Sequence, residues 1–192
     1  MENSPLKQEA VSLIEQLELF TNMQPYGKAT LVGSVALDLI VKRDIDIHIV
    51  SSNPALLAQA TAIAQQALKN PLVKQVRLKK YHEIPPSGAQ AVLITLEECA
   101  GFTGPWSINL WLTTDISATG IEKTKKLQEL LTAPQRKIIM HIKTALHQKK
   151  LLSQGLSTKI YQAVIGHSVT TPQGFFAYLK QEAQSGKASV NE

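Results

Sequence analysis

The stretch LVGSVALDLIVKRDIDIHIV, residues 31–50, decides the fold of this chain. It begins with a short apolar strand and a turn at Gly33 and Ser34. The compact apolar run VALDLI that follows predicts a helix of about two turns. From residue 44 onward, polar and apolar residues alternate, as is typical of a strand with one buried face. We therefore predict a strand–turn–helix–strand unit at the centre of an α/β (α+β) domain with a small mixed sheet.

Asp44 and Asp46 lie two residues apart on the second predicted strand. Their side chains, and that of His48, should therefore point to the same face, while the isoleucines between them point to a core. Two carboxylates side by side repel each other unless a cation lies between them. Oxygen ligands of this kind suit Mg²⁺ or Mn²⁺. The pair predicts a metal site.

The turn at Gly33 and Ser34 comes directly before a predicted helix. Such a turn offers backbone N–H groups and a hydroxyl to a phosphate. A phosphate site beside a metal-binding carboxylate pair predicts phosphoryl or nucleotidyl transfer.

Gly33-Ser34 followed by Asp44-Ile45-Asp46 resembles the signature of the nucleotidyltransferase superfamily, which includes small antibiotic-modifying enzymes and free-standing minimal domains. The resemblance implies transfer of a nucleoside monophosphate from a nucleoside triphosphate to an acceptor, with magnesium ions. Ser34, with Gly33, would bind the β- and γ-phosphates, and Asp44 and Asp46 would hold the metals. The alternative is a chance Gly-Ser turn before an exposed Asp-x-Asp strand.

The family pattern also requires a third carboxylate on a later strand, and here the chain differs. The candidate strand is residues 106–112, WSINLWL, in which Asn109 stands at the expected position. An asparagine can offer a carbonyl oxygen to a metal, but it has no charge and cannot accept a proton at neutral pH. Asp115 would share its face only if the strand continued that far. His48 could supply a base instead, or it could be an ordinary strand residue.

Two tryptophans on this strand have opposite parity, so Trp106 and Trp111 should lie on opposite faces of the sheet. Trp111 shares the face of Asn109 and could stack on a base, although core packing is the more common role. Arg43, directly before the carboxylates, could bind phosphates or balance the acidic strand.

The composition limits the class of protein and its cellular location. The chain has 192 residues, 44% of them hydrophobic, and a formal net charge of +5. No apolar run is long enough to span a membrane, and residues 1–5 do not have the basic start of a signal peptide. The single cysteine excludes an internal disulfide and suits a reducing cytoplasm. The sequence thus predicts a cytoplasmic protein with no membrane partner.

Basic residues are concentrated at 74–80 and again from residue 123 to residue 150. They could form an RNA-binding surface, or they could coat solvated helix faces, which we favour because aromatic residues are not interleaved with them.

Outside the central unit, the pattern predicts a helix opened by Ser4 and Pro5, with an apolar stripe that includes Val11 and Phe20. Residues 82–88 are predicted to form a loop because of their prolines. We predict a nucleotidyltransferase-like domain at 1–117, a helical C-terminal part at 118–184 and a disordered tail at 185–192. The remaining predicted elements are helices at 53–69, 119–131, 134–149, 153–165 and 172–182 and strands at 29–32, 73–78, 91–96 and 107–112.

Three hypotheses follow. The first is a metal-dependent nucleotidyltransferase in which Asp44, Asp46 and Asn109 form the catalytic set and Gly33, Ser34 and Arg43 bind the nucleotide. The second is a degenerate member of that fold that binds nucleotide or a partner without efficient catalysis. The third is a basic RNA-associated domain. The acceptor, a small molecule or a macromolecule, cannot be read from the sequence.

Overall fold

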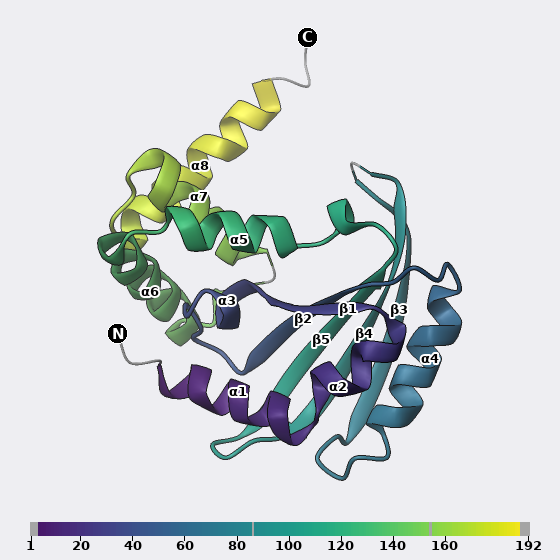
Figure 1. Cartoon of the computed structure of the whole chain (residues 1–192). Helices are drawn as coiled ribbons and strands as arrows, with labels where there is room; N and C mark the ends of the chain where they lie inside the picture. The colour runs from purple at the N-terminus through teal and green to yellow at the C-terminus, as the bar shows by residue number, and fades with distance from the viewer. Residues whose placement is uncertain (1–3, 86, 154, 189–192) are drawn as a thin grey trace. The chain divides into compact units, whose positions relative to one another are not determined.

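The computed structural model describes residues 4–85, 87–153 and 155–188 (Figure 1). The chain divides into two compact units, residues 1–129 and residues 130–192. No helix in the described ranges is long and apolar enough to cross a membrane.

The first unit is built on a five-stranded mixed sheet with the order β1-β2-β5-β4-β3. β2 pairs with β5 in parallel, and the other neighbours are antiparallel. This architecture confirms the predicted fold class. The strands are β1 (Lys28–Val32), β2 (Asp44–Val50), β3 (Gln75–Ile84), β4 (Ala89–Ala100) and β5 (Pro105–Thr113).

One face of the sheet carries the core. Ile45, Ile47 and Ile49 on β2 are each 0% exposed, and the alternate residues of β4 and β5 lie on the same face. Helices α1 (Pro5–Gln16), α2 (Leu19–Met23) and α4 (Leu56–Ala67) cover this face (Figure 1). The opposite face of β2 and β5 is left for the polar residues between the isoleucines, including both aspartates.

The N-terminal helix begins as predicted, with Ser4 as N-cap and proline at the first helical position. It ends earlier than expected, because Glu18 adopts a left-handed conformation (φ 48°) that separates α1 from α2. Two residues of the predicted apolar stripe lie outside the core: Val11 is 37% exposed and Phe20 is 41% exposed.

Other predicted elements also differ in length from those observed. α3 (Gly33–Ala36) is a single turn, because Asp38 takes a left-handed conformation (φ 54°) just beyond it. The predicted loop at 82–88 is largely the end of a hairpin, since β3 continues to Ile84 and β4 begins at Ala89. Strand pairing across the hairpin overrides the local proline signal up to that turn.

The loop between β4 and β5 is held to α1 by one carboxylate. Glu9, 8% exposed, accepts hydrogen bonds from the Thr103 backbone (2.9 Å), the Thr103 hydroxyl (2.6 Å) and the Trp106 indole (3.0 Å). Burial alone would raise the pKa of Glu9, but these hydrogen bonds hold its pKa below the ordinary value.

The second unit is helical. α6 begins with a capping box between Thr132 and Gln135. The core of this second unit includes Ile139, Ile160 and Phe175, each 0% exposed. The remaining helices of the chain are η1 (Gln24–Tyr26), η2 (Ile116–Ala118), α5 (Ile121–Leu130), α6 (Ala133–Gln148), α7 (Leu156–His167) and α8 (Pro172–Ala188).

α8 ends at Ala188, so residues 185–188 of the segment predicted as a disordered tail are part of this helix. Residues 189–192 of that segment lie outside the described residues.

We expect Glu9→Ala to lower the free energy of unfolding by about 2–4 kcal/mol, because it leaves the buried Trp106 N–H without an acceptor and removes both hydrogen bonds to Thr103. Glu15→Ala, at an exposed position of the same helix, should change it by less than about 0.5 kcal/mol. Because the pKa of Glu9 is lowered in the folded state, its charge stabilises the fold above the unfolded-state pKa and loses that effect as pH falls. Urea denaturation at pH 7 and pH 3 would test both points. Equal losses for the two alanine variants would contradict the argument.

Candidate active site

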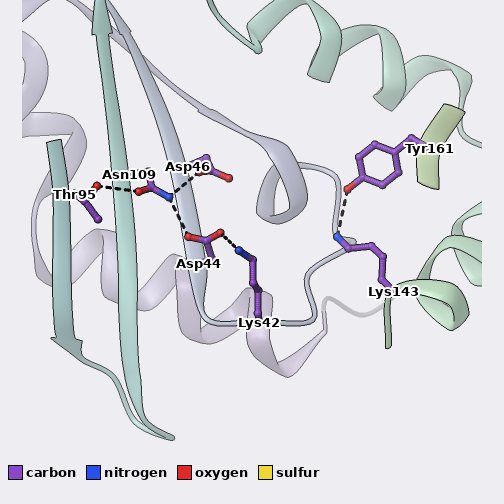
Figure 2. Close-up of polar contacts among 7 residues, drawn as sticks. All are labelled: Lys42, Asp44, Asp46, Thr95, Asn109, Lys143 and Tyr161. Atoms are coloured by element: carbon purple, nitrogen blue, oxygen red, sulfur yellow. Dashed lines mark hydrogen bonds and ion pairs between the residues drawn. The ribbon is translucent and has the colours of Figure 1, made fainter. Parts of the chain in front are cut away.

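The parallel pairing of β2 with β5 brings three of the predicted site residues together. Asp46 lies opposite Asn109 in the register, and Asp44 lies opposite Ser107. Asn109 Nδ2 is 3.0 Å from Asp44 Oδ1 and 3.1 Å from Asp46 Oδ1 (Figure 2). The two N–H groups of one amide are therefore donated to two carboxylates.

Two further side chains contact this cluster (Figure 2). Thr95 on β4 donates its hydroxyl to Asn109 Oδ1 at 3.2 Å. The Lys42 ammonium lies 2.6 Å from Asp44 Oδ2. In this arrangement the carboxylates are compensated by an amide and an ammonium from the chain itself.

The Gly33-Ser34 turn lies against the cluster. Gly33 has φ +67°, and a Cβ atom at this position would lie 3.1 Å from Asp46 Oδ2. Its backbone N–H donates to the Thr124 hydroxyl at 3.2 Å, so this donor is already used within the chain. Ser34 follows at the start of the single-turn α3 and is half-buried.

Arg43 is not brought into the cluster. Its guanidinium donates to the Thr103 hydroxyl in the β4–β5 loop, at 3.1 Å from Nε and 2.5 Å from Nη2. Asp115 also lies apart, because β5 ends at Thr113 and the Asp115 carboxylate accepts from the Ser117 backbone at 2.8 Å.

His48 lies on the same face as the carboxylates, and its surroundings decide its protonation. Nδ1 accepts a hydrogen bond from the Gly120 backbone N–H at 3.0 Å. Burial lowers the pKa of His48 to about 4. The imidazole is therefore neutral at pH 7 with its proton on Nε2, which leaves neither nitrogen placed to act as a general base.

The two tryptophans lie on opposite faces, as their parity predicts. Trp106 is 1% exposed in the core, whereas Trp111 is half-buried on the face of Asn109. The Trp111 ring lies between His48 and Tyr81, with centroids 6.1 and 5.0 Å away, and its indole N–H donates to the Ala118 carbonyl at 2.9 Å. These contacts fix the ring in place beside the cluster.

The donor set fits one divalent cation. One oxygen of Asp44 and one of Asp46 converge on the point now taken by Asn109 Nδ2. A half-turn of the Asn109 amide would present Oδ1 to the carboxylates and Nδ2 to the Thr95 hydroxyl, which can also accept. Across the described residues, no three His, Cys, Asp or Glu side chains are grouped as for a metal ion. The set therefore does not provide the third carboxylate that a second metal would require.

Sequence reasoning did not identify Thr95 or Thr124. Both join the site through contacts between segments far apart in the chain, 14 residues from Asn109 and 91 residues from Gly33 respectively. No local pattern marks such residues, because the pairing of β4 with β5 and the position of α5 create their roles.

No protein-family model and no curated protein matches the sequence. Solved structures do match. The Cid1 poly(U) polymerase gives a TM-score of 0.57 at 14% identity, over 85% of this chain and 49% of that chain. A cytoplasmic RNA terminal U-transferase gives 0.53 at 13% identity, over 85% and 47%.

A third match is terminal uridylyl transferase 4 from Trypanosoma brucei with bound GTP, with a TM-score of 0.51 at 12% identity, over 82% of this chain and 48% of that chain. This chain thus spans about half the length of these structures. Their likeness shows that the chain has a nucleotidyltransferase fold.

We expect Gly33→Ala to destabilise the first unit by about 1–3 kcal/mol, because the site requires positive φ and leaves little room beside Asp46. Gly166→Ala in α7, where a Cβ would meet open space, should be neutral or slightly stabilising. Thermal unfolding of both variants measures the difference. A stable Gly33→Ala protein would show that the turn is less constrained than the geometry indicates.

Proposed function

We propose that the protein is a metal-dependent nucleotidyltransferase that transfers a nucleoside monophosphate from a nucleoside triphosphate to an acceptor. The observation that carries the proposal is the convergence of Asp44 and Asp46 on Asn109, beside the Gly33-Ser34 turn, in a nucleotidyltransferase fold. The acceptor would be a small molecule or a macromolecule.

Each residue has a defined task in this proposal. Asp44 and Asp46, with Asn109 Oδ1, would hold one Mg²⁺ or Mn²⁺ ion. Such an ion, when bound, neutralises phosphate charge and polarises the reacting phosphorus. The Ser34 hydroxyl would bind the β- or γ-phosphate. Arg43 would contribute only after leaving Thr103, so we place it outside the immediate nucleotide contacts.

A second candidate function is nucleotide binding without efficient catalysis. It is favoured by Asn109, which cannot take the proton of an attacking hydroxyl, and by the neutral His48, whose Nδ1 is already used. Without a base, nucleotidyl transfer would rest on positioning and electrostatic stabilisation alone.

RNA is a third option for the partner. The structural neighbours include a Cid1 complex with its short product ApU and one with a UTP analogue. The net charge of +5 would attract a polyanion. We also predict a cytoplasmic location, because a chain with a single cysteine suits a reducing compartment.

We expect calorimetric titration of ATP, GTP, CTP and UTP with Mg²⁺ or Mn²⁺ to detect binding of at least one nucleotide. The Asp44→Asn/Asp46→Asn variant should lose at least about tenfold in affinity, because the cation that bridges protein and phosphates is no longer held. Glu15→Gln/Glu83→Gln removes the same charge at exposed positions and should bind normally. Absence of binding to the wild type with either metal would refute the proposal.

We expect Asn109→Asp to raise the rate of nucleotidyl transfer or of triphosphate hydrolysis by about 10²-fold, because it supplies the missing carboxylate. Asn53→Asp is a matched control at an exposed turn, where Asn53 Oδ1 accepts from the Ala55 backbone and a carboxylate can do the same. Release of labelled pyrophosphate or phosphate from a γ-labelled nucleotide measures the rate. An unchanged or lower rate would favour a function in binding alone.

A further inference from the structure

Without a bound metal ion, the charges of Asp44 and Asp46 must be compensated by other groups of the chain. The Asp44 side chain is 16% exposed, so water can compensate its charge only in part. Asp46 lies on the same face, and both carboxylates direct one oxygen toward the same point. Such a pair requires positive charge or hydrogen-bond donors close by.

The first compensating group is the Asn109 amide. It donates one N–H to each carboxylate, and its oxygen accepts from Thr95. The Thr95 hydroxyl thus satisfies the amide oxygen while the nitrogen faces the carboxylates. Every polar atom of this amide has a partner without any ion.

The second compensating group is Lys42. Its ammonium lies 2.6 Å from Asp44 Oδ2, on the carboxylate oxygen that Asn109 does not use. The Lys42 side chain is 44% exposed and comes from the segment directly before β2. It can therefore leave Asp44 for solvent without disturbing the sheet.

We propose that Lys42 is an internal counter-ion that competes with a divalent cation for Asp44 and thereby sets the cation affinity of this site. Together with the Asn109 amide, it keeps the carboxylate pair assembled when no metal is bound. A divalent cation at this point must turn the Asn109 amide, and the Lys42 ammonium on the other oxygen of Asp44 repels it. This inference rests on the proposed metal site but not on nucleotide binding or transfer.

Replacement of Lys42 tests the competition in both directions. Without divalent cations, Lys42→Met should melt at a lower temperature than the wild type, because Asp44 loses its ammonium partner. Calorimetry with Mn²⁺ alone should show about tenfold tighter binding, which corresponds to about 1.4 kcal/mol. Added Mn²⁺ should remove the difference in melting temperature between Lys42→Met and the wild type. Lys28→Met, which removes the same charge at an exposed position, should match the wild type in all three measurements.

The possible outcomes separate this inference from the proposed function. If the wild type binds no metal–nucleotide complex but Lys42→Met binds Mn²⁺ more tightly, the proposed function fails and the counter-ion role stands. If Lys42→Met binds Mn²⁺ no more tightly than the wild type and Lys28→Met, the counter-ion role is overturned. An unchanged melting temperature of Lys42→Met in the presence of EDTA would overturn it as well.

Discussion

The parallel register between β2 and β5 is the constraint on which the fold and the candidate site both depend. It places Ile45, Ile47 and Ile49 in the core at 0% exposure and aligns Asp46 with Asn109 on the opposite face. A shift by one residue would exchange the two faces of β2 and force both carboxylates into an apolar interior, at a cost of several kcal/mol for each. The hydrophobic requirement of the core and the geometry of the polar cluster therefore select the same register.

The same constraint explains which features the sequence could predict. Alternation along residues 44–50 predicted β2 with its observed bounds, because the two-residue period belongs to the strand itself. The length of α3 and the extent of the β3–β4 hairpin were wrong. The first depends on the left-handed conformation of Asp38, and the second depends on pairing with a neighbouring strand. The direction of Arg43 depends on Thr103, 60 residues away, which no local pattern can reveal.

The two faces of the central strands in the first unit are stabilised by different kinds of interaction. The core face is stabilised by apolar burial, which does not depend on the protonation of side chains. The opposite face is stabilised by hydrogen bonds among Thr95, Asn109 and the two aspartates, together with the exposed ion pair of Lys42. The Lys42 ammonium matters for the cluster because it adds a positive charge next to Asp44 and close to Asp46.

Asn109 therefore has a second effect besides the absence of a general base: it lowers the negative charge of the cluster. A carboxylate at this position would place a third negative charge in the register of Asp46, and the cluster would then require cations to remain assembled. With an amide, the same three side chains hold one another through direct hydrogen bonds. Asn109 and Lys42 thus act in the same direction, since one removes a negative charge and the other adds a positive charge. A chain with this pair can keep the architecture of the proposed site in a metal-free state, and a cation would then have to compete for its place.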